Sequence, residues 1–465
     1  MKHKLLMILV AMFAMNMYAQ DLTGQWNGVL KVQGVQLRLV FNVAKSDNGY
    51  SSTMDSPDQG ANGIPVTSTT FENSTLQFVV SNAGIQYTGV LVENKFVGTF
   101  KQGGMELPLN LSRDVVAKEN SIRPQEPKEP FPYYSEDVTF INKEADISLS
   151  GTLTLPSKVG KFPVVILISG SGPQNRDQEL FGHKPFLVIS DYLTKKGIAV
   201  LRYDDRGVGQ SSGEFKTATT VDFATDVESA IAYLKTRKEI NKNKIGLIGH
   251  SEGGIIAPLV ASKSKDVSFI VLLAGTGIPG DQLLLRQQQA ISKAGGVSGT
   301  ELAKSLETSA QAFELIAQSN NDQTLKEDLT KLLEKNLERD ITVNLSNGMT
   351  KEEFISAQVE QISSPWTQYF VKYDPATALE KVKCPVLAVI GEKDLQVPAK
   401  ENLEAISNAL KNGGNKEVTT KVFPGLNHLF QECETGLPME YANINQTFSP
   451  TALLEITEWI IKQAK

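Results

Sequence analysis

The stretch IGLIGHSEGG, residues 245–254, places a serine between one short apolar run and a second that begins at Ile255. This context predicts a buried strand, a sharp turn and a helix, with Ser251 at the apex of the turn. Gly249 and Gly253 carry no Cβ atom, so the backbone can turn tightly and the serine hydroxyl projects from the end of the strand. The first N–H groups of the helix point at the same place, where they stabilise a developing negative charge. The stretch therefore predicts a nucleophilic serine.

A serine hydroxyl is a poor nucleophile unless a base removes its proton, and the chain has four histidines. His3 lies in the N-terminal leader. His250 neighbours the serine inside the turn, so its side chain should point away from the serine Oγ and pack beside the turn. His183 lies in a loop ahead of a predicted helix. His428 follows the last predicted strand of the chain, and we therefore expect it to be the general base.

A histidine base needs a carboxylate that fixes its tautomer and stabilises its charged form. The segment GEKD, residues 391–394, directly follows the apolar run 386–390, which places it at the carboxyl edge of the predicted sheet. Asp394 is the predicted acid, and Glu392, closer to the strand, is interpreted as a turn residue. The order Ser251, Asp394, His428 is the order in which α/β-hydrolases carry their catalytic triad.

An oxyanion hole requires two backbone donors. The first is expected to be the N–H of Glu252, the residue after the serine. The second is expected from the loop SGSGP, residues 169–173, where Ser171 is the favoured donor because its small neighbours let the backbone approach a substrate closely. Glycine-rich loops also bind phosphate, but no Lys-Ser/Thr pair follows here, which excludes a P-loop.

Beyond residue 136, apolar runs alternate with amphipathic segments, which predicts a doubly wound, mostly parallel α/β sheet in a catalytic domain spanning 136–465. Residues 164–168 form a continuous apolar run typical of a strand buried on both faces. Residues of about 276–380 break the alternation, because they have helical periodicity and no clear strand. We expect a helical cap over the sheet there, the alternative being a separate helical domain.

The N-terminal part has a different pattern. Residues 20–113 alternate apolar and polar side chains between turn-forming residues, which predicts a small antiparallel all-β domain. Residues 114–135 are rich in proline and charge, and predict a stiff, solvated linker. Residues 1–19 combine two lysines, an apolar run too short to span a bilayer and a small residue, Ala19, and predict a signal peptide. The protein is therefore expected to be exported, periplasmic or secreted.

Composition limits the partners. The formal net charge of -6 gives no reason to expect a nucleic acid partner. Beyond the N-terminal leader the sequence contains no apolar run long enough to cross a bilayer, so we expect no stable membrane anchor. The isolated histidines cannot form a His-rich metal site, and no metal cluster or cofactor fingerprint is present. We expect no cofactor and a small-molecule ester or acyl substrate. The sequence does not indicate an oligomeric state.

Three segments together resemble the α/β-hydrolase superfamily, and specifically exported bacterial serine esterases related to serine aminopeptidase-like and acyl-aminoacyl-peptidase-like hydrolases. They are SGSGPQNRD at residues 169–177, RYDDRGVGQS at 202–211 and the acid loop at 391–398. The resemblance covers residues 135–465 and implies the fold and the triad, but no particular substrate. Asp204 and Arg206 in the second segment are interpreted as structural, holding adjacent loops by charge-assisted hydrogen bonds.

The leading hypothesis is a carboxylesterase that works through a Ser-His-Asp triad and an acyl-enzyme. The alternative is a serine peptidase acting on short peptides or acyl-peptides, and a catalytically silent binding protein is a third. Trp366 and Phe370 share one face of a predicted cap helix. They are candidates for the wall of an acyl pocket, against the simpler interpretation that they pack in a core.

Overall fold

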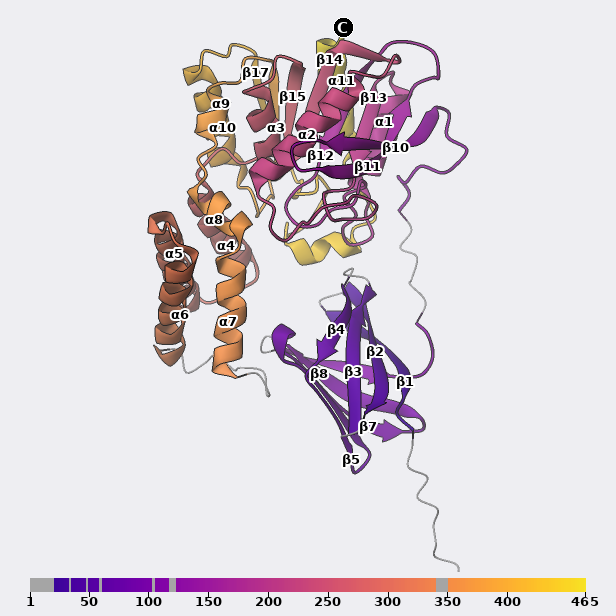
Figure 1. Ribbon diagram of the computed structural model, residues 1–465, viewed down its shortest axis with the longest axis vertical. Coiled ribbons are helices and arrows are strands. Elements are labelled where there is room, and N and C mark those ends of the chain that lie inside the picture. Colours follow the sequence, from indigo (N-terminus) through magenta and orange to yellow (C-terminus); the bar gives the residue numbers. More distant parts are fainter. Residues whose placement is uncertain are drawn as a thin grey trace, which may run out of the picture. The chain divides into compact units, whose positions relative to one another are not determined.

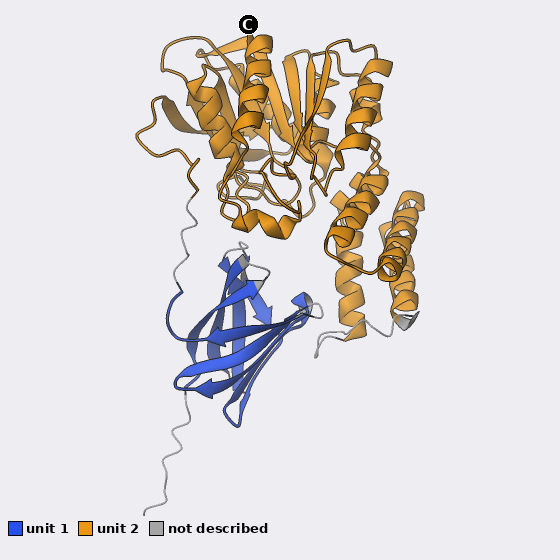
Figure 2. Cartoon of the chain, turned by 180° about the vertical axis from the view of Figure 1, so that it is seen from behind, with its two compact units in different colours: residues 1–32, 36–118, 345–349 blue, residues 33–35, 119–344, 350–465 orange. Residues whose placement is uncertain are grey.

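The computed structural model describes residues 21–32, 35–46, 49–57, 61–102, 105–116, 123–339 and 350–465. Nearly all described residues up to 116 form one compact unit, and those from 123 onward form a second (Figure 2). The predicted signal peptide lies outside the described residues. No helix within the described ranges is long and apolar enough to cross a membrane.

The N-terminal unit consists of two sheets that share one hydrophobic core. The apolar side chains alternate along each strand; on β6, for example, Leu76, Phe78 and Val80 are buried while Gln77 is exposed. The first sheet contains β1 (Gly24–Val32), β2 (Val35–Ser46), β3 (Gly49–Ser56) and β4 (Ala61–Val66). The second contains β5 (Ser68–Glu72), β6 (Thr75–Val80), β7 (Ile85–Val92), β8 (Lys95–Gln102) and β9 (Met105–Leu111). The prediction of an all-β N-terminal fold is confirmed.

The second unit is built on an eight-stranded sheet (Figure 1). Its strand order is β10-β11-β13-β12-β14-β15-β16-β17. β11 runs antiparallel to both of its neighbours, and every later neighbouring pair is parallel. The strands are β10 (Tyr134–Asn142), β11 (Ile147–Leu155), β12 (Phe162–Ile168), β13 (Ala199–Tyr203), β14 (Ile240–His250), β15 (Val267–Leu273), β16 (Val386–Gly391) and β17 (Val418–Phe423).

Helices cover both faces of this sheet. One core contains side chains of α2 (Thr220–Leu234), α3 (Gly253–Ala261) and α10 (Ala399–Asn412), and the other contains those of α1 (Pro185–Lys195) and α11 (Pro450–Ala464). Alternate residues of β12 therefore enter different cores, which explains why the strand is apolar throughout. This is the doubly wound α/β-hydrolase arrangement that the sequence predicts.

Among the described residues, six helices lie between β15 and β16. They are α4 (Gly280–Ala294), α5 (Gly299–Gln318), α6 (Asp322–Arg339), α7 (Lys351–Ile362), α8 (Pro365–Lys372) and the short α9 (Ala376–Leu379). α5, α6 and α7 share a small core of their own with Val371 of α8. Leu283 and Phe370 instead pack into the core of the sheet, so α4 and α8 attach the insertion to the sheet rather than leaving it separate.

Part of the range expected to be a solvated linker is packed into the second unit. Arg123 is only 8% exposed, and its guanidinium donates to the backbone carbonyl oxygens of Phe181, Gly182, Ala442 and Ile444. The expectation differs from the structure because proline and charge spacing reports on local stiffness. The spacing of prolines and charges does not reveal that Arg123 donates hydrogen bonds to backbone carbonyls far away in the sequence.

We predict that Arg123→Ala destabilises the second unit by about 3 kcal/mol or more, because buried carbonyls lose a charged donor. Urea unfolding followed by tryptophan fluorescence in a Trp26→Phe background measures this, since the remaining tryptophans, 366 and 459, both lie in the second unit. The control is Arg286→Ala, whose side chain is 59% exposed and 3.7 Å from Glu401. Equal stability of the two variants would contradict the assignment.

Candidate active site

Ser251 lies between the end of β14 and the start of α3. Its φ of 54° is in the left-handed region, which residues other than glycine seldom adopt. The conformation is held by the serine N–H, which donates to Leu273 O of β15 at 2.9 Å, and by Gly254 N–H, which donates to Ser251 O at 2.9 Å. The backbone thus forms the strained turn that presents a serine hydroxyl beyond a sheet.

The two flanking glycines are required by close backbone contacts. A Cβ atom on Gly249 would collide with the carbonyl of Gly253, and a Cβ on Gly253 would collide with the carbonyl of Ile168 at the end of β12. The start of α3 therefore packs directly against two strand ends. Any side chain at either glycine would push the helix away from the serine.

His428 and Asp394 form a buried hydrogen-bonded pair. His428 Nδ1 and Asp394 Oδ2 are 2.8 Å apart, and each residue is 4% exposed. The other oxygen of Asp394 accepts the backbone N–H groups of Gln396 and Val397, both at 2.8 Å. Since the carboxylate accepts a hydrogen bond from Nδ1–H, Nε2 of His428 is the ring nitrogen left to accept a proton from a nucleophile.

His250 holds the loop that carries His428. Its Nε2–H donates to the backbone carbonyl of His428 at 3.0 Å, so its Nδ1 accepts from Gln178 Nε2, which lies 2.6 Å away. The two histidine rings are 4.7 Å apart between centroids. Burial lowers the pKa of His250 to about 3, aided by the nearby His428, which keeps the ring neutral. The side chain of His250 thus positions the histidine loop beside Ser251.

Geometry thereby brings the predicted base and acid into contact and ties their loop to the serine turn. Among the described residues, the structure contains no hydrogen bond between Ser251 Oγ and the ring of His428. The distance between a catalytic serine and its histidine is often long without substrate and shortens in the Michaelis complex. The assignment of Ser251, Asp394 and His428 as a triad remains a prediction that substitution can test.

The loop predicted to complete the oxyanion hole passes directly over the serine. A Cβ atom on Gly170 would lie 3.1 Å from Ser251 Cβ, and Gly172 has a φ of 91°. Only glycine allows this approach at position 170 without displacing the serine. Ser171 is exposed between these glycines, and Glu252 immediately precedes α3, at the helix end where backbone N–H groups have no intrahelical acceptor.

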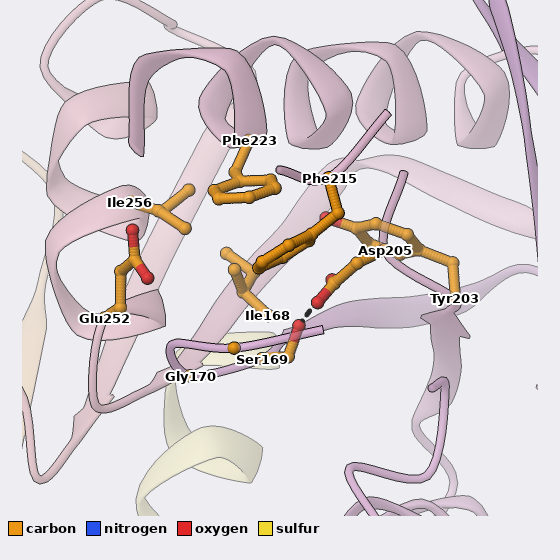
Figure 3. Close-up of a pocket in the computed structure, with 10 residues that line it drawn as sticks. Ile168, Ser169, Gly170, Tyr203, Asp205, Phe215, Phe223, Glu252 and Ile256 are labelled. Atoms are coloured by element: carbon orange, nitrogen blue, oxygen red, sulfur yellow. Dashed lines mark hydrogen bonds between the residues drawn. The ribbon is translucent and has the colours of Figure 1, made fainter. Parts of the chain in front are cut away.

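Two neighbouring aspartates hold this loop in place. Ser169 Oγ donates to Asp205 at 2.6 Å (Figure 3), and Gln174 N–H donates to the other oxygen of the same carboxyl at 3.0 Å. Asp204 accepts the backbone N–H of Arg176 at 2.8 Å and its guanidinium through two further contacts. Burial raises the pKa of Asp205 to about 8, in spite of the hydrogen bond from Ser169.

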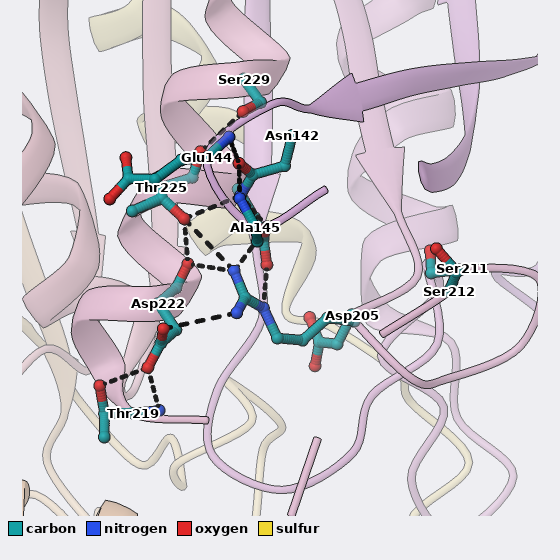
Figure 4. A network of polar contacts seen from close by, with 12 residues as sticks. Asn142, Glu144, Ala145, Asp205, Ser211, Ser212, Thr219, Asp222, Thr225 and Ser229 are labelled. Carbon is teal, nitrogen blue, oxygen red and sulfur yellow. Dashed lines mark hydrogen bonds and ion pairs between the residues drawn. The ribbon is translucent and has the colours of Figure 1, made fainter. Parts of the chain in front are cut away.

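Arg206 anchors the segment 202–211 to α2. Its Nε and Nη2 both donate to the Asp226 carboxylate at 2.8 Å, and Nη2 also donates to Asp222 O at 2.7 Å. Figure 4 shows the surrounding network, in which Thr225 and Asn142 also take part. The segment 202–211 therefore acts as a structural brace for the loops at the sheet edge, as its residue types indicate.

The predicted wall residues of the cap occupy different environments. Trp366 is half-buried, and its indole stacks on Phe370 with 4.8 Å between ring centroids. Phe370 is 5% exposed and packs in the core of the sheet. Trp366 is the more exposed of the two, and a direct contact of either ring with substrate remains a prediction. The buried ring of Phe370 packs against the face of the Trp366 indole.

His183 has a structural environment that sequence position did not reveal. Its Nε2 donates to Tyr441 O and its Nδ1 accepts from Thr447 Oγ1, both at 2.9 Å. Gln431, three residues after His428, contacts the same ring at 3.0 Å. No local sequence signal could have revealed this environment, because the partners of His183 lie 248 to 264 positions away along the chain.

Comparison with known proteins places this geometry in a family. Residues 146–425 match the family described as X-Pro dipeptidyl-peptidase (S15 family). The chain is similar to esterase EstD of Thermotoga maritima, with 27% identity over 339 residues that cover 71% of this chain and 70% of the esterase. It is also similar to a putative carboxymethylenebutenolidase of Synechocystis, with 30% identity over 149 residues that cover 29% of this chain and 56% of that protein.

Among solved structures, the esterase Pf2001 of Pyrococcus furiosus is similar over 72% of this chain and 94% of its own, with 16% identity and a TM-score of 0.42.

Within the described ranges, no group of three or more histidine, cysteine, aspartate or glutamate side chains is arranged to hold a metal ion.

The buried His183 predicts an acid-sensitive fold. Burial and the nearby Arg123 lower its pKa from 6.5 to about 4, so the folded state favours the neutral ring. The unfolded chain therefore binds more protons between these two values. The contribution of His183 to the free energy of unfolding is fully present above about pH 6.5 and is lost as the pH drops toward 4.

We expect wild-type protein to lose about 2 kcal/mol more unfolding free energy between pH 7 and pH 5 than His183→Gln does. His250 shifts in the same direction but is present in both proteins, so its contribution cancels. Urea titrations at the two pH values measure the difference. An equal loss in both proteins would show that His183 titrates normally in the fold.

Proposed function

The chain belongs to the X-Pro dipeptidyl-peptidase (S15) family, and from this premise we propose that it is a serine hydrolase that cleaves carboxylic esters. The observation that carries the proposal is the buried His428–Asp394 pair, tied through His250 to the strained turn of Ser251. The similarity to esterase EstD over most of both chains supports an ester as the substrate.

In the proposed cycle, Ser251 Oγ attacks the acyl carbonyl while His428 Nε2 takes its proton. The N–H groups of Glu252 and Ser171 stabilise the oxyanion. His428 then protonates the leaving alcohol, which departs and leaves an acyl-enzyme. A water molecule loses a proton to His428 and attacks the acyl group. His428 then returns this proton to Ser251 Oγ as the bond between the acyl group and the serine breaks, which releases a carboxylic acid.

A second candidate is a serine peptidase acting on short peptides or acyl-peptides, which the family match favours. A peptidase of this kind needs a partner for the terminal charge of its substrate. Parallel assays on p-nitrophenyl esters and aminoacyl-p-nitroanilides separate the two functions. Faster turnover of the anilides would favour the peptidase.

We also propose that the protein is exported, to the periplasm or beyond, on the basis of the lysines and apolar run in residues 1–19. Mass spectrometry of the N-terminus from cell fractions tests this. An intact N-terminus in the cytoplasmic fraction would contradict it.

Ser251→Ala is expected to lower kcat on p-nitrophenyl acetate by several orders of magnitude, because the nucleophile is lost while the fold is retained. Labelling by a fluorophosphonate probe should disappear with it. Turnover at the wild-type rate would refute the proposed nucleophile.

The acid loop supplies a matched control pair for this assay. Asp394→Asn replaces the carboxylate that accepts a hydrogen bond from His428 Nδ1–H and is expected to lower kcat strongly. Glu392→Gln changes a carboxyl that accepts a hydrogen bond from the backbone N–H of Gly425, and should retain most of the activity. Equal losses in the two variants would remove Asp394 from the proposed triad.

A further inference from the structure

The carboxyl group of Glu252 makes two hydrogen bonds that the proposed cycle does not use. Its Oε1 accepts from Thr220 Oγ1 at 2.7 Å and from Trp366 Nε1 at 2.8 Å. Thr220 is the first residue of α2, and Trp366 lies in the first turn of the cap helix α8. The residue next to the nucleophile therefore joins the cap to the sheet domain through its side chain.

This carboxyl is buried, so its hydrogen-bond partners matter. Glu252 is 4% exposed, and burial raises the pKa of its carboxyl group, against the hydrogen bonds from Thr220 and Trp366. A buried acceptor that loses its donors, or a buried donor that loses its acceptor, is costly. The indole N–H of Trp366 is consequently bound to one place beside the serine turn.

The indole ring is fixed from a second direction. Its face stacks on Phe370 at an interplanar angle of 22°, and Phe370 is buried in the core of the sheet. The backbone carbonyl of Phe370 lies against Gly280, where a Cβ atom would collide with it. The stack sets the plane of the ring, and the hydrogen bond to Glu252 sets its position within that plane.

The contact lies close to the reacting centre. Glu252 and Gly170 line one small cavity of about 10 Å³, together with Ser169, Phe215 and Ile256 (Figure 3). Gly170 in turn lies against Ser251, as its close approach to the serine Cβ shows. The half-buried indole is thus bonded to a residue that follows Ser251 in the chain and borders the same small cavity as the predicted oxyanion loop.

We propose that the Glu252 carboxyl group determines specificity through Trp366, by holding the indole as a rigid wall that limits the length of the acyl group. The inference rests on the proposed esterase function and deepens it. Glu252 contributes its backbone N–H to the oxyanion and its side chain to the choice of substrate. In this second role it is a positioning residue, because Trp366 and not the carboxyl meets the acyl chain.

Three substitutions separate the parts of this contact. Trp366→Phe removes the N–H donor and retains an aromatic ring that can stack on Phe370. Glu252→Leu removes the acceptor, whereas Glu252→Gln keeps an amide oxygen that can accept from the indole. Trp459→Phe is the matched control, since Trp459 packs against Phe269 in the core on the other face of the sheet.

The measured quantity is the ratio of kcat/KM on p-nitrophenyl octanoate to kcat/KM on p-nitrophenyl acetate. We expect Trp366→Phe and Glu252→Leu to raise this ratio by about tenfold, because a released or smaller ring admits the longer chain. Glu252→Gln and Trp459→Phe should keep the ratio within about twofold of the wild type. Loss of stability alone lowers both rates together and leaves the ratio unchanged.

An unchanged ratio in active Trp366→Phe enzyme would overturn the proposal, and so would a ratio for Glu252→Gln equal to that of Glu252→Leu. If Glu252→Leu fails to fold, the pair Trp366→Phe and Glu252→Gln still decides. If the wild type hydrolyses neither ester, the proposed function fails instead. Labelling rates of Ser251 with short and long alkyl fluorophosphonates then test the length preference directly, by the same criteria.

Discussion

The left-handed backbone of Ser251 is the constraint on which the site depends. A non-glycine residue at a φ of 54° persists only where its surroundings enforce it. Here the serine N–H extends the ladder between β14 and β15, and the start of α3 packs on strand ends with no space for a side chain at Gly249 or Gly253. Sheet, turn and helix therefore fix the hydroxyl as one rigid unit.

Buried polar side chains carry this rigidity to the other loops at the sheet edge. His250 reaches from the serine turn to the loop of His428, and Asp204 and Asp205 hold the glycine-rich loop that passes over the serine. Each of these groups has hydrogen-bond partners inside the protein, which is what makes burial of so many polar atoms tolerable. The loops are consequently placed by a network rather than by their own local conformation.

The cap is attached at the same place. Glu252 follows the proposed nucleophile, and its carboxyl accepts from Trp366 of α8 while α8 itself bridges the cap core and the sheet core. A change in how the cap sits would act on a residue adjacent to the reacting serine. The proposed role of Glu252 would couple chemistry and substrate selection through this one side chain.

The sequence by itself determined the α/β fold, the serine turn and the candidate base and acid. Glycine spacing, apolar periodicity and chain order are local signals, and four histidines leave few choices. Only the tertiary structure decided which distant partners meet: His250 and His428 are 178 positions apart, and Glu252 and Trp366 are 114 apart. Local patterns contain no record of such pairs, because the contacts form only when the sheet and the cap pack together.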